Sequence, residues 1–217
     1  MERFPIDKVV NILREEIPKY KEPIVGKYAK ERSPFKVLIS TLLSLRTKDQ
    51  TTAPACDRLF AVADSPERLA ALPPSKIEKL IYPVGFYKVK ARTVISVCRV
   101  LLEKYDGRVP DSLDELLTIK GVGRKTANLV VTLGYGKPGI CVDIHVHRIS
   151  NRWGYIKTAV PDESEFELRR ILPKKFWIEY NDLLVTYGQN LCVPVSPFCS
   201  QCRIERYCKK VGVKSRR

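Results

Sequence analysis

The sequence lacks any long apolar run, and this absence excludes a membrane-spanning segment. Hydrophobic residues make up 44% of the 217 residues, but charges interrupt them repeatedly. No stretch approaches the roughly 18 apolar residues that are needed to cross a bilayer. The first residues also lack the uninterrupted apolar segment of a secretory signal. We therefore expect a globular intracellular protein with no membrane partner.

Acidic residues are scarce relative to basic ones. The chain has 24 Asp and Glu against 39 Lys and Arg, which gives a formal net charge of +15. One interpretation is a solvated, heat-adapted surface rich in lysine. The other is a partner rich in phosphate, because a positive field attracts polyanions and binding releases their counterions. The charge alone does not choose between these interpretations, so the choice depends on motifs.

Successive segments of alternating polarity are also missing, whereas helical spacing recurs from end to end, so we predict an all-α fold. Ser33 is a suitable N-cap and Pro34 a suitable first residue for a core helix. Further helices are predicted to start at these positions: Thr51, Ser65 with Pro66, Ser75, Lys88, Ser112, after Gly123, after Asp143, Asp162 and after Pro173. Connections that are short and contain Pro or Gly indicate compact helix packing.

Ile119 to Gly136 contains the first motif that indicates chemistry, IKGVGRKTANLVVTLGYG. A glycine turn joins a short helix to a second helix. Glycines allow the backbone to approach a phosphate closely, and the first N–H groups of a helix attract anions. An ordinary corner between two helices would also use these glycines. The adjoining Arg124 and Lys125 favour a phosphate site.

Lys125 and Asp143 form the second candidate. A helix from Lys125 rises about 15 Å at roughly 1.5 Å per residue. The segment GKPGICV can return up to about 23 Å at roughly 3.3 Å per residue. Asp143 can therefore come back beside Lys125. Taken singly, Asp143 also suits the N-cap of the following helix, and Lys125 suits a solvated surface position.

Four of the seven cysteines lie within 17 residues near the C-terminus, namely Cys192, Cys199, Cys202 and Cys208. Such a group inside a cell indicates metal ligation before disulfides. A zinc ribbon usually presents two C-x2-C pairs, whereas this segment has one pair, so the spacing favours a [4Fe-4S] cluster over zinc. Cys56, Cys98 and Cys141 lie alone in apolar surroundings and are expected to be buried.

With these features in this order, the sequence resembles the endonuclease III family of helix-hairpin-helix DNA glycosylases. The resemblance covers nearly the whole chain. It rests on the segments LISTLLSLRTKDQTT, GFYKVKARTVISVCRVL, GVGRKTANLVV and VDIHVHRISNRW, followed by the four-cysteine loop. It implies a two-lobed fold, with a six-helix domain over residues 27–137 and a second domain made of 1–26 and 138–217.

The resemblance also implies a bifunctional DNA glycosylase/AP lyase of base excision repair. It would remove oxidised pyrimidines and cleave 3′ to the abasic site by β-elimination through a lysine Schiff base. Lys125 would be the nucleophile, Asp143 the carboxylate beside it, and the four cysteines the [4Fe-4S] ligands. The implied phosphate contacts are Gly121, Val122 and Gly123, and the adjoining Arg124 is expected to bind DNA. The partner would be double-stranded DNA with a damaged pyrimidine or an abasic site, bound by a monomer in the cytoplasm or nucleoid.

Three positions depart from the family pattern. Arg46 stands where the family commonly has a Gln that fills the gap left by the extruded nucleotide, and Phe86 stands where Leu is frequent. Lys120 replaces the usual Pro before the hairpin glycines. We expect Arg46 and Phe86 to fill the gap and the nearby Lys48 to contact DNA. These departures bear on the opposite-base preference and the substrate range.

Two alternatives remain at this point. The mismatch or adenine glycosylase branch is similar but generally lacks a lysine at the position of Lys125, although Arg46 is compatible with activity on G-mismatched bases. A non-catalytic iron-sulfur DNA-binding module would not need Lys125 and Asp143 together.

The excess charge is expected to face DNA at four places. These are the hairpin, the Arg46–Lys48 segment, the helix start at Lys88–Arg92, and the tail 203–217, which has seven Lys or Arg and one Glu.

Overall fold

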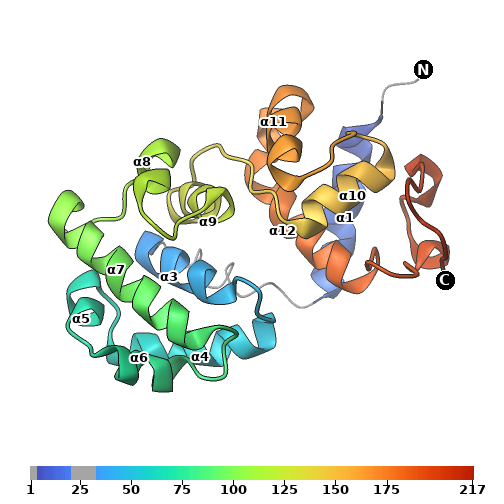
Figure 1. Cartoon of the computed structure of the whole chain (residues 1–217). Coiled ribbons are helices and arrows are strands. Elements are labelled where there is room, and N and C mark those ends of the chain that lie inside the picture. Colours follow the sequence, from blue (N-terminus) through green and yellow to red (C-terminus); the bar gives the residue numbers. More distant parts are fainter. Residues whose placement is uncertain (1–3, 21–32) are drawn as a thin grey trace. The chain divides into compact units, whose positions relative to one another are not determined.

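The computed structural model describes residues 4–20 and 33–217, and the chain divides into two compact units. One unit combines Met1–Pro23 with Pro138–Arg217, and the other is Ile24–Lys137. The predicted boundary between residues 26 and 27 lies outside the described residues. Helices and loops make up the described part of the chain, which contains no β-strand (Figure 1). No helix within that part is both long and apolar enough to cross a membrane.

The unit Ile24–Lys137, called the central unit for its place in the sequence, has its described helices packed around α3 and α7. Its helices are α3 (Pro34–Ser44), α4 (Asp49–Val62), α5 (Pro66–Ala70), α6 (Pro74–Ile81), α7 (Tyr87–Tyr105), α8 (Leu113–Thr118) and α9 (Arg124–Leu129), and a π-helical turn, η2 (Val130–Gly134), follows directly. Helix α7 packs against α5 and α6, and α3 packs against α4, α7, α9 and η2 (Figure 1). This packing places the turn before α9 and the loops before α4 and α7 on one helical framework.

Local sequence signals explain where several helices begin. The Ser33 hydroxyl accepts a hydrogen bond from the Lys36 N–H at 3.3 Å, and Pro34 is the first residue of α3. Ser65 caps α5 in the same way, with Pro66 following it. The N-cap predicted at Ser33 and the helix start predicted at Ser65 with Pro66 are therefore confirmed. Helices α4, α6, α7 and α11 begin one or two residues before their predicted starts, which is the usual uncertainty at a helix end.

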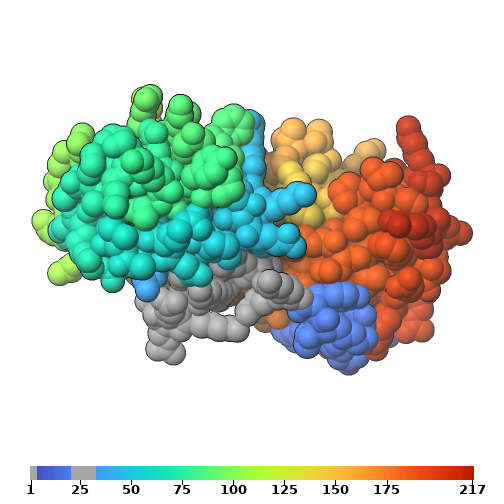
Figure 2. Space-filling view, turned by 90° about the horizontal axis from the view of Figure 1, so that it is seen from below, coloured from blue at the N-terminus to red at the C-terminus, as the bar shows by residue number. Residues whose placement is uncertain are grey.

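The other unit joins the N-terminal helix to the C-terminal third of the chain. Its elements are α1 (Ile6–Glu16), η1 (Ile17–Lys19), α10 (Ile144–Trp153), α11 (Pro161–Ile171), η3 (Lys174–Phe176), α12 (Trp177–Asn190), η4 (Cys199–Gln201) and η5 (Glu205–Tyr207). Helix α12 packs against α10 and α1, and Figure 2 shows the N-terminal helix lying against residues from the C-terminal end. An ion pair of 2.5 Å between Arg14 and Glu179 joins α1 to α12.

Each unit has its own apolar core. Leu38, Leu43 and Leu59 are fully buried in the central unit, and Trp153 and Tyr180 are buried in the other. The three isolated cysteines, Cys56, Cys98 and Cys141, are buried, which confirms their predicted role as core residues.

Candidate functional site

The turn between α8 and α9 uses its two glycines differently. At Gly121 φ is +95°, and a Cβ atom would come within 2.7 Å of Thr93 Cγ2, so only glycine fits without strain. At Gly123 φ is −91°, and a Cβ atom would meet nothing within 4 Å. Between them, the buried Val122 donates its N–H to the Ile119 carbonyl at 2.9 Å and anchors the turn. The fold therefore requires glycine at position 121, whereas Gly123 borders open space.

Arg124 and Lys125 are the first two residues of α9. Both side chains are half-buried, whereas Thr126 and Ala127 face the core. The Asn128 side-chain amide donates to the Arg124 carbonyl at 3.1 Å within this helix. The structure therefore presents Lys125 immediately beyond the glycine turn, on the part of α9 that is not buried in the core.

Two loops of the central unit bring the predicted gap-filling residues together. Arg46 and Phe86 are both exposed, and the Arg46 guanidinium carbon lies 6.0 Å from the centre of the Phe86 ring. Both residues have positive φ values, 53° and 57°, which only a minority of non-glycine residues adopt. Lys48 is exposed and forms the N-cap position of α4. The sequence predicted these residues as DNA contacts separately, and the structure pairs Arg46 with Phe86.

Asp143 caps helix α10. Its Oδ1 atom accepts hydrogen bonds from the backbone N–H groups of His145 at 2.8 Å and Val146 at 3.0 Å. The side chain is 7% exposed, so the predicted capping role is confirmed. Asp143 belongs to the unit that contains residues 138–217, and Lys125 belongs to the central unit. Their predicted proximity therefore stays a prediction.

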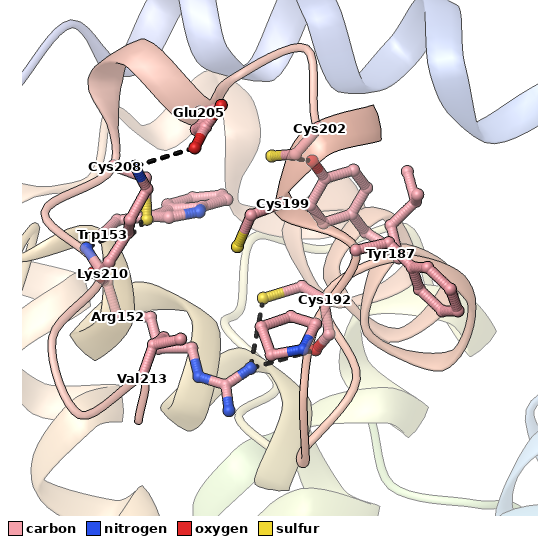
Figure 3. A pocket seen from close by; sticks show the side chains of 13 residues that line it. Arg152, Trp153, Tyr187, Cys192, Cys199, Cys202, Glu205, Cys208, Lys210 and Val213 are labelled. Carbon is pink, nitrogen blue, oxygen red and sulfur yellow. Dashed lines mark hydrogen bonds and ion pairs between the residues drawn. The ribbon is translucent and has the colours of Figure 1, made fainter. Parts of the chain in front are cut away.

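The four C-terminal cysteines surround one pocket, which Arg152, Trp153, Tyr187 and Lys210 also line (Figure 3). All four are free thiols. Burial raises the pKa of Cys202, and it raises the pKa of Cys208 to about 11. Within residues 4–20 and 33–217, no three His, Cys, Asp or Glu side chains are gathered closely enough to hold a single metal ion.

Hydrogen-bonding groups lie beside three of the four sulfur atoms. The Cys192 sulfur accepts from the Arg152 guanidinium at 3.5 Å, and the Cys208 sulfur accepts from the Lys210 backbone N–H at 3.3 Å. The Tyr187 hydroxyl lies 2.8 Å from the Cys202 sulfur. Arg152 is 8% exposed and also donates to the Val193 carbonyl at 2.7 Å and the Pro194 carbonyl at 2.5 Å. This buried cation ties the cysteine loop to α10.

Residues 39–174 match the family described as HhH-GPD superfamily base excision DNA repair protein. An endonuclease III of Thermotoga maritima is 47% identical over 180 residues, which cover 83% of this chain and 84% of the relative. The chain belongs to the endonuclease III family. It is accordingly a bifunctional DNA glycosylase/AP lyase of base excision repair.

Solved structures of the endonuclease III family support the same fold. A trapped covalent endonuclease III–DNA intermediate matches with a TM-score of 0.86 and 32% identity over 97% of both chains. A thermostable thymine-DNA glycosylase matches with a TM-score of 0.76 and 26% identity, over 82% of this chain and 84% of that one. These matches confirm the predicted all-α helix-hairpin-helix glycosylase fold of this endonuclease III relative.

Sequence reasoning missed the burial of two cations, Lys90 and Arg152, in this endonuclease III relative. Lys90 was predicted to face DNA with the helix start at Lys88–Arg92, and this is wrong for Lys90, which is 9% exposed. The available signal was its place on the apolar face of α7, four residues before the buried Val94. Arg152 lies similarly beside Ile149 and Trp153. In the basic tail, Arg203 pairs with Glu15 at 2.8 Å, so part of that charge is neutralised within the unit.

Proposed function

We propose that Lys125 is the nucleophile with which this glycosylase, which removes oxidised pyrimidines, also cleaves the DNA strand. The observation that carries the proposal is the turn before α9. Gly123 borders open space where a side chain would otherwise stand, so a DNA phosphate can approach the backbone there. Lys125 lies two residues beyond, in the first turn of the helix. A strand held at the turn brings its sugar towards that amine.

The Lys125 amine attacks C1′ of the deoxyribose of a damaged nucleotide. The bond between C1′ and the base breaks, and the base leaves with the electron pair and gains a proton. Opening of the sugar ring gives a Schiff base between Lys125 and C1′. Loss of a proton from C2′ then expels the 3′ phosphate, which cuts the strand. Water finally hydrolyses the Schiff base and returns the free amine.

In this proposal, Asp143 supplies the carboxylate of the reaction. It accepts the proton that the attacking amine loses and stabilises positive charge on the sugar as the base departs. Its hydrogen bonds to the first turn of α10 fix the orientation of the carboxylate. Lys125 would belong to the six-helix domain over residues 27–137, and Asp143 to the domain made of 1–26 and 138–217.

The proposed partner is double-stranded DNA that contains a damaged pyrimidine or an abasic site. Gly121, Val122, Gly123 and Arg124 would hold a phosphate, and Lys48 would contact the strand. Arg46 and Phe86 would enter the space left when the nucleotide is flipped out of the stack, because a guanidinium can donate to the orphaned base and an aromatic ring can stack. We propose that a monomer performs this reaction on chromosomal DNA, in the cytoplasm or nucleoid.

The four C-terminal cysteines are proposed to bind a [4Fe-4S] cluster. Four cysteines around one pocket match the four thiolate ligands that such a cluster requires, and the donors to the Cys192 and Cys208 sulfurs suit anionic ligands. The buried Arg152 offsets the negative charge of such ligands. Cys192, Cys199, Cys202 and Cys208 would hold the cluster within the segment 192–208, where it would have a structural role.

Metal analysis tests the cluster with a matched pair of thiol deletions. The protein is expected to hold about four irons per chain and to absorb near 400 nm. Cys199→Ser should lose iron and colour, whereas Cys141→Ala, which removes a buried thiol elsewhere in the same unit, should keep both. One zinc per chain and no colour would contradict this assignment.

Strand cleavage tests the assignment of the nucleophile. Duplexes that contain thymine glycol, an abasic site or a G-mismatched base are incubated with the wild type, Lys125→Ala and Lys79→Ala. Lys79 is an exposed lysine of α6 and controls for the lost charge. Lys125→Ala should lose cleavage of the first two substrates, and Lys79→Ala should cleave them normally. A folded Lys125→Ala variant that still cleaves would refute the assignment, and a preference for the mismatched duplex would favour the mismatch glycosylase alternative.

A further inference from the structure

Lys90 is a lysine on the buried face of α7. Its amine donates to the carbonyl of Leu43 at 2.7 Å, the carbonyl of Leu45 at 2.5 Å and the hydroxyl of Thr47 at 3.1 Å. Burial lowers the pKa of Lys90 to about 8, so the amine remains mostly protonated at neutral pH. A charge withdrawn from water costs free energy unless acceptors surround it. Here two carbonyls from the negative end of α3 receive it.

The same amine connects two loops that are far apart in the sequence. The Thr47 hydroxyl that receives Lys90 also accepts the backbone N–H of Gly85 at 3.1 Å. Gly85 lies so close to the first loop that a Cβ atom there would be 3.1 Å from the Arg46 carbonyl oxygen. Thr47 therefore links the first loop directly to Gly85, and the Lys90 amine holds residues 45 and 47 of that loop from the helix that follows Gly85.

These linked loops carry Arg46 and Phe86 in a backbone conformation that neither residue type prefers. Each has a positive φ, and each side chain is exposed, with 62% of Phe86 accessible. Such conformations persist only where the surrounding structure holds them. The hydrogen bonds from the Lys90 amine and to the Thr47 hydroxyl hold these loops together with backbone bonds, such as that from the Thr47 N–H to the Ser44 carbonyl at 3.0 Å.

We propose that Lys90 is a positioning residue that keeps Arg46 and Phe86 as a preformed pair, ready to enter the space left by a flipped nucleotide. This inference rests on the proposed gap-filling role of those two residues. A preformed pair does not have to be ordered when DNA binds, so less binding free energy is lost. Releasing the loops displaces both side chains, and a displacement of about 1 Å in a reacting complex can cost about 100-fold in rate.

The test compares two substrates that differ in their need for gap filling. One is a duplex with thymine glycol, in which a paired nucleotide must leave the stack. The other is a single-stranded oligonucleotide with an abasic site, which has no opposite base and needs only the lyase step. Lys90→Met keeps the length of the side chain and removes its donors. Lys104→Met removes an exposed charge from the last turn of the same helix and serves as the control.

Lys90→Met is expected to lower kcat/KM on the duplex by about 10- to 100-fold and to leave single-strand cleavage within about twofold of wild type. Lys104→Met should match wild type on both substrates. Thr47→Val, which removes only the bridging hydroxyl, should show the same substrate split and covers the case in which Lys90→Met does not fold. Equal losses on both substrates would overturn the proposal, because a general structural defect would cause them.

A combined variant separates this proposal from the proposed function. Arg46→Ala with Phe86→Ala is expected to lower activity on the duplex, and adding Lys90→Met should then cause no further loss, because Lys90 acts through those two side chains. A multiplicative further loss would overturn the positioning role alone. Duplex activity unchanged by Arg46→Ala with Phe86→Ala would overturn the gap-filling role itself and this inference with it.

Discussion

Replacing each hairpin glycine by alanine should separate folding from DNA binding. At Gly123 the backbone angle suits alanine and the added methyl group meets nothing within 4 Å. At Gly121 the angle is +95° and the methyl group would lie 2.7 Å from Thr93 Cγ2. The two substitutions are chemically identical and only two residues apart. Any difference between them therefore reports the local structure.

The two substitutions are expected to change the stability of the free protein in opposite directions. Gly123→Ala should stabilise the free protein by roughly 0.4–1 kcal/mol, because alanine restricts the unfolded chain. Gly121→Ala should destabilise it by about 1–3 kcal/mol, because a strained backbone has to be maintained. A chain of this length shifts its Tm by roughly 2–4 °C per kcal/mol. On DNA, Gly123→Ala should lose about 1.5–3 kcal/mol, which is the typical contribution of a hydrogen bond to a charged group.

The assay combines thermal unfolding with fluorescence anisotropy on a duplex that holds a non-cleavable abasic-site analogue. Gly123→Ala should melt at or above the wild-type temperature and bind at least about tenfold more weakly. A Gly123→Ala variant that binds as tightly as wild type would show that no phosphate approaches this glycine. Unchanged stability in Gly121→Ala would refute the conformational argument for the turn.

Three further predictions follow from individual contacts. Asp143→Asn keeps an N-cap residue on α10 and should lower the rate of strand cleavage by about 10²–10⁴-fold without lowering Tm. Asp143→Ala should lose the same activity and also about 1 kcal/mol of stability. A lower Tm of the Asn variant would contradict this prediction. Arg152→Met should lower the free energy of unfolding in urea by about 2–3 kcal/mol, because the carbonyls of Val193 and Pro194 lose a charged donor. The variant should also release iron faster than wild type. Unchanged iron retention would argue against a role of Arg152 in holding the cysteine loop. The pKa of Lys90 is about 8 in the folded protein and 10.5 in the unfolded chain, so between these values the unfolded chain binds more protons. The stability of wild type relative to Lys90→Met should therefore increase as the pH rises from about 8 to 10.5. A difference between the two urea midpoints that decreases over this range would contradict the lowered pKa.

Features set by neighbouring residues were predictable from the sequence. The caps at Ser33, Ser65 and Asp143 depend on side chains that reach backbone groups two or three residues away, so they follow from local spacing. The glycine turn and the grouped cysteines are equally local. The catalytic roles of Lys125 and Asp143 were predicted from the family resemblance, because no single motif spacing indicates the reaction.

Contacts between distant segments were not predictable in the same way. Lys90 looks like one of several basic residues at a helix start, and only the packing of α7 against α3 places its amine at the end of α3. The pairing of Arg46 with Phe86 depends on loops 40 residues apart in sequence and on backbone angles that no composition indicates. The burial of Arg152 was not predictable for the same reason, because its acceptors, the carbonyls of Val193 and Pro194, lie on the cysteine loop.

The central claim is that one amine, that of Lys125, forms the covalent bond to DNA. Reduction with borohydride during reaction with a thymine-glycol duplex should trap a protein–DNA adduct, and peptide mapping by mass spectrometry should locate it. The account predicts a single modified peptide with the sugar remnant on Lys125, and no adduct from Lys125→Ala. An adduct on another lysine, or on the N-terminal amine, would contradict it.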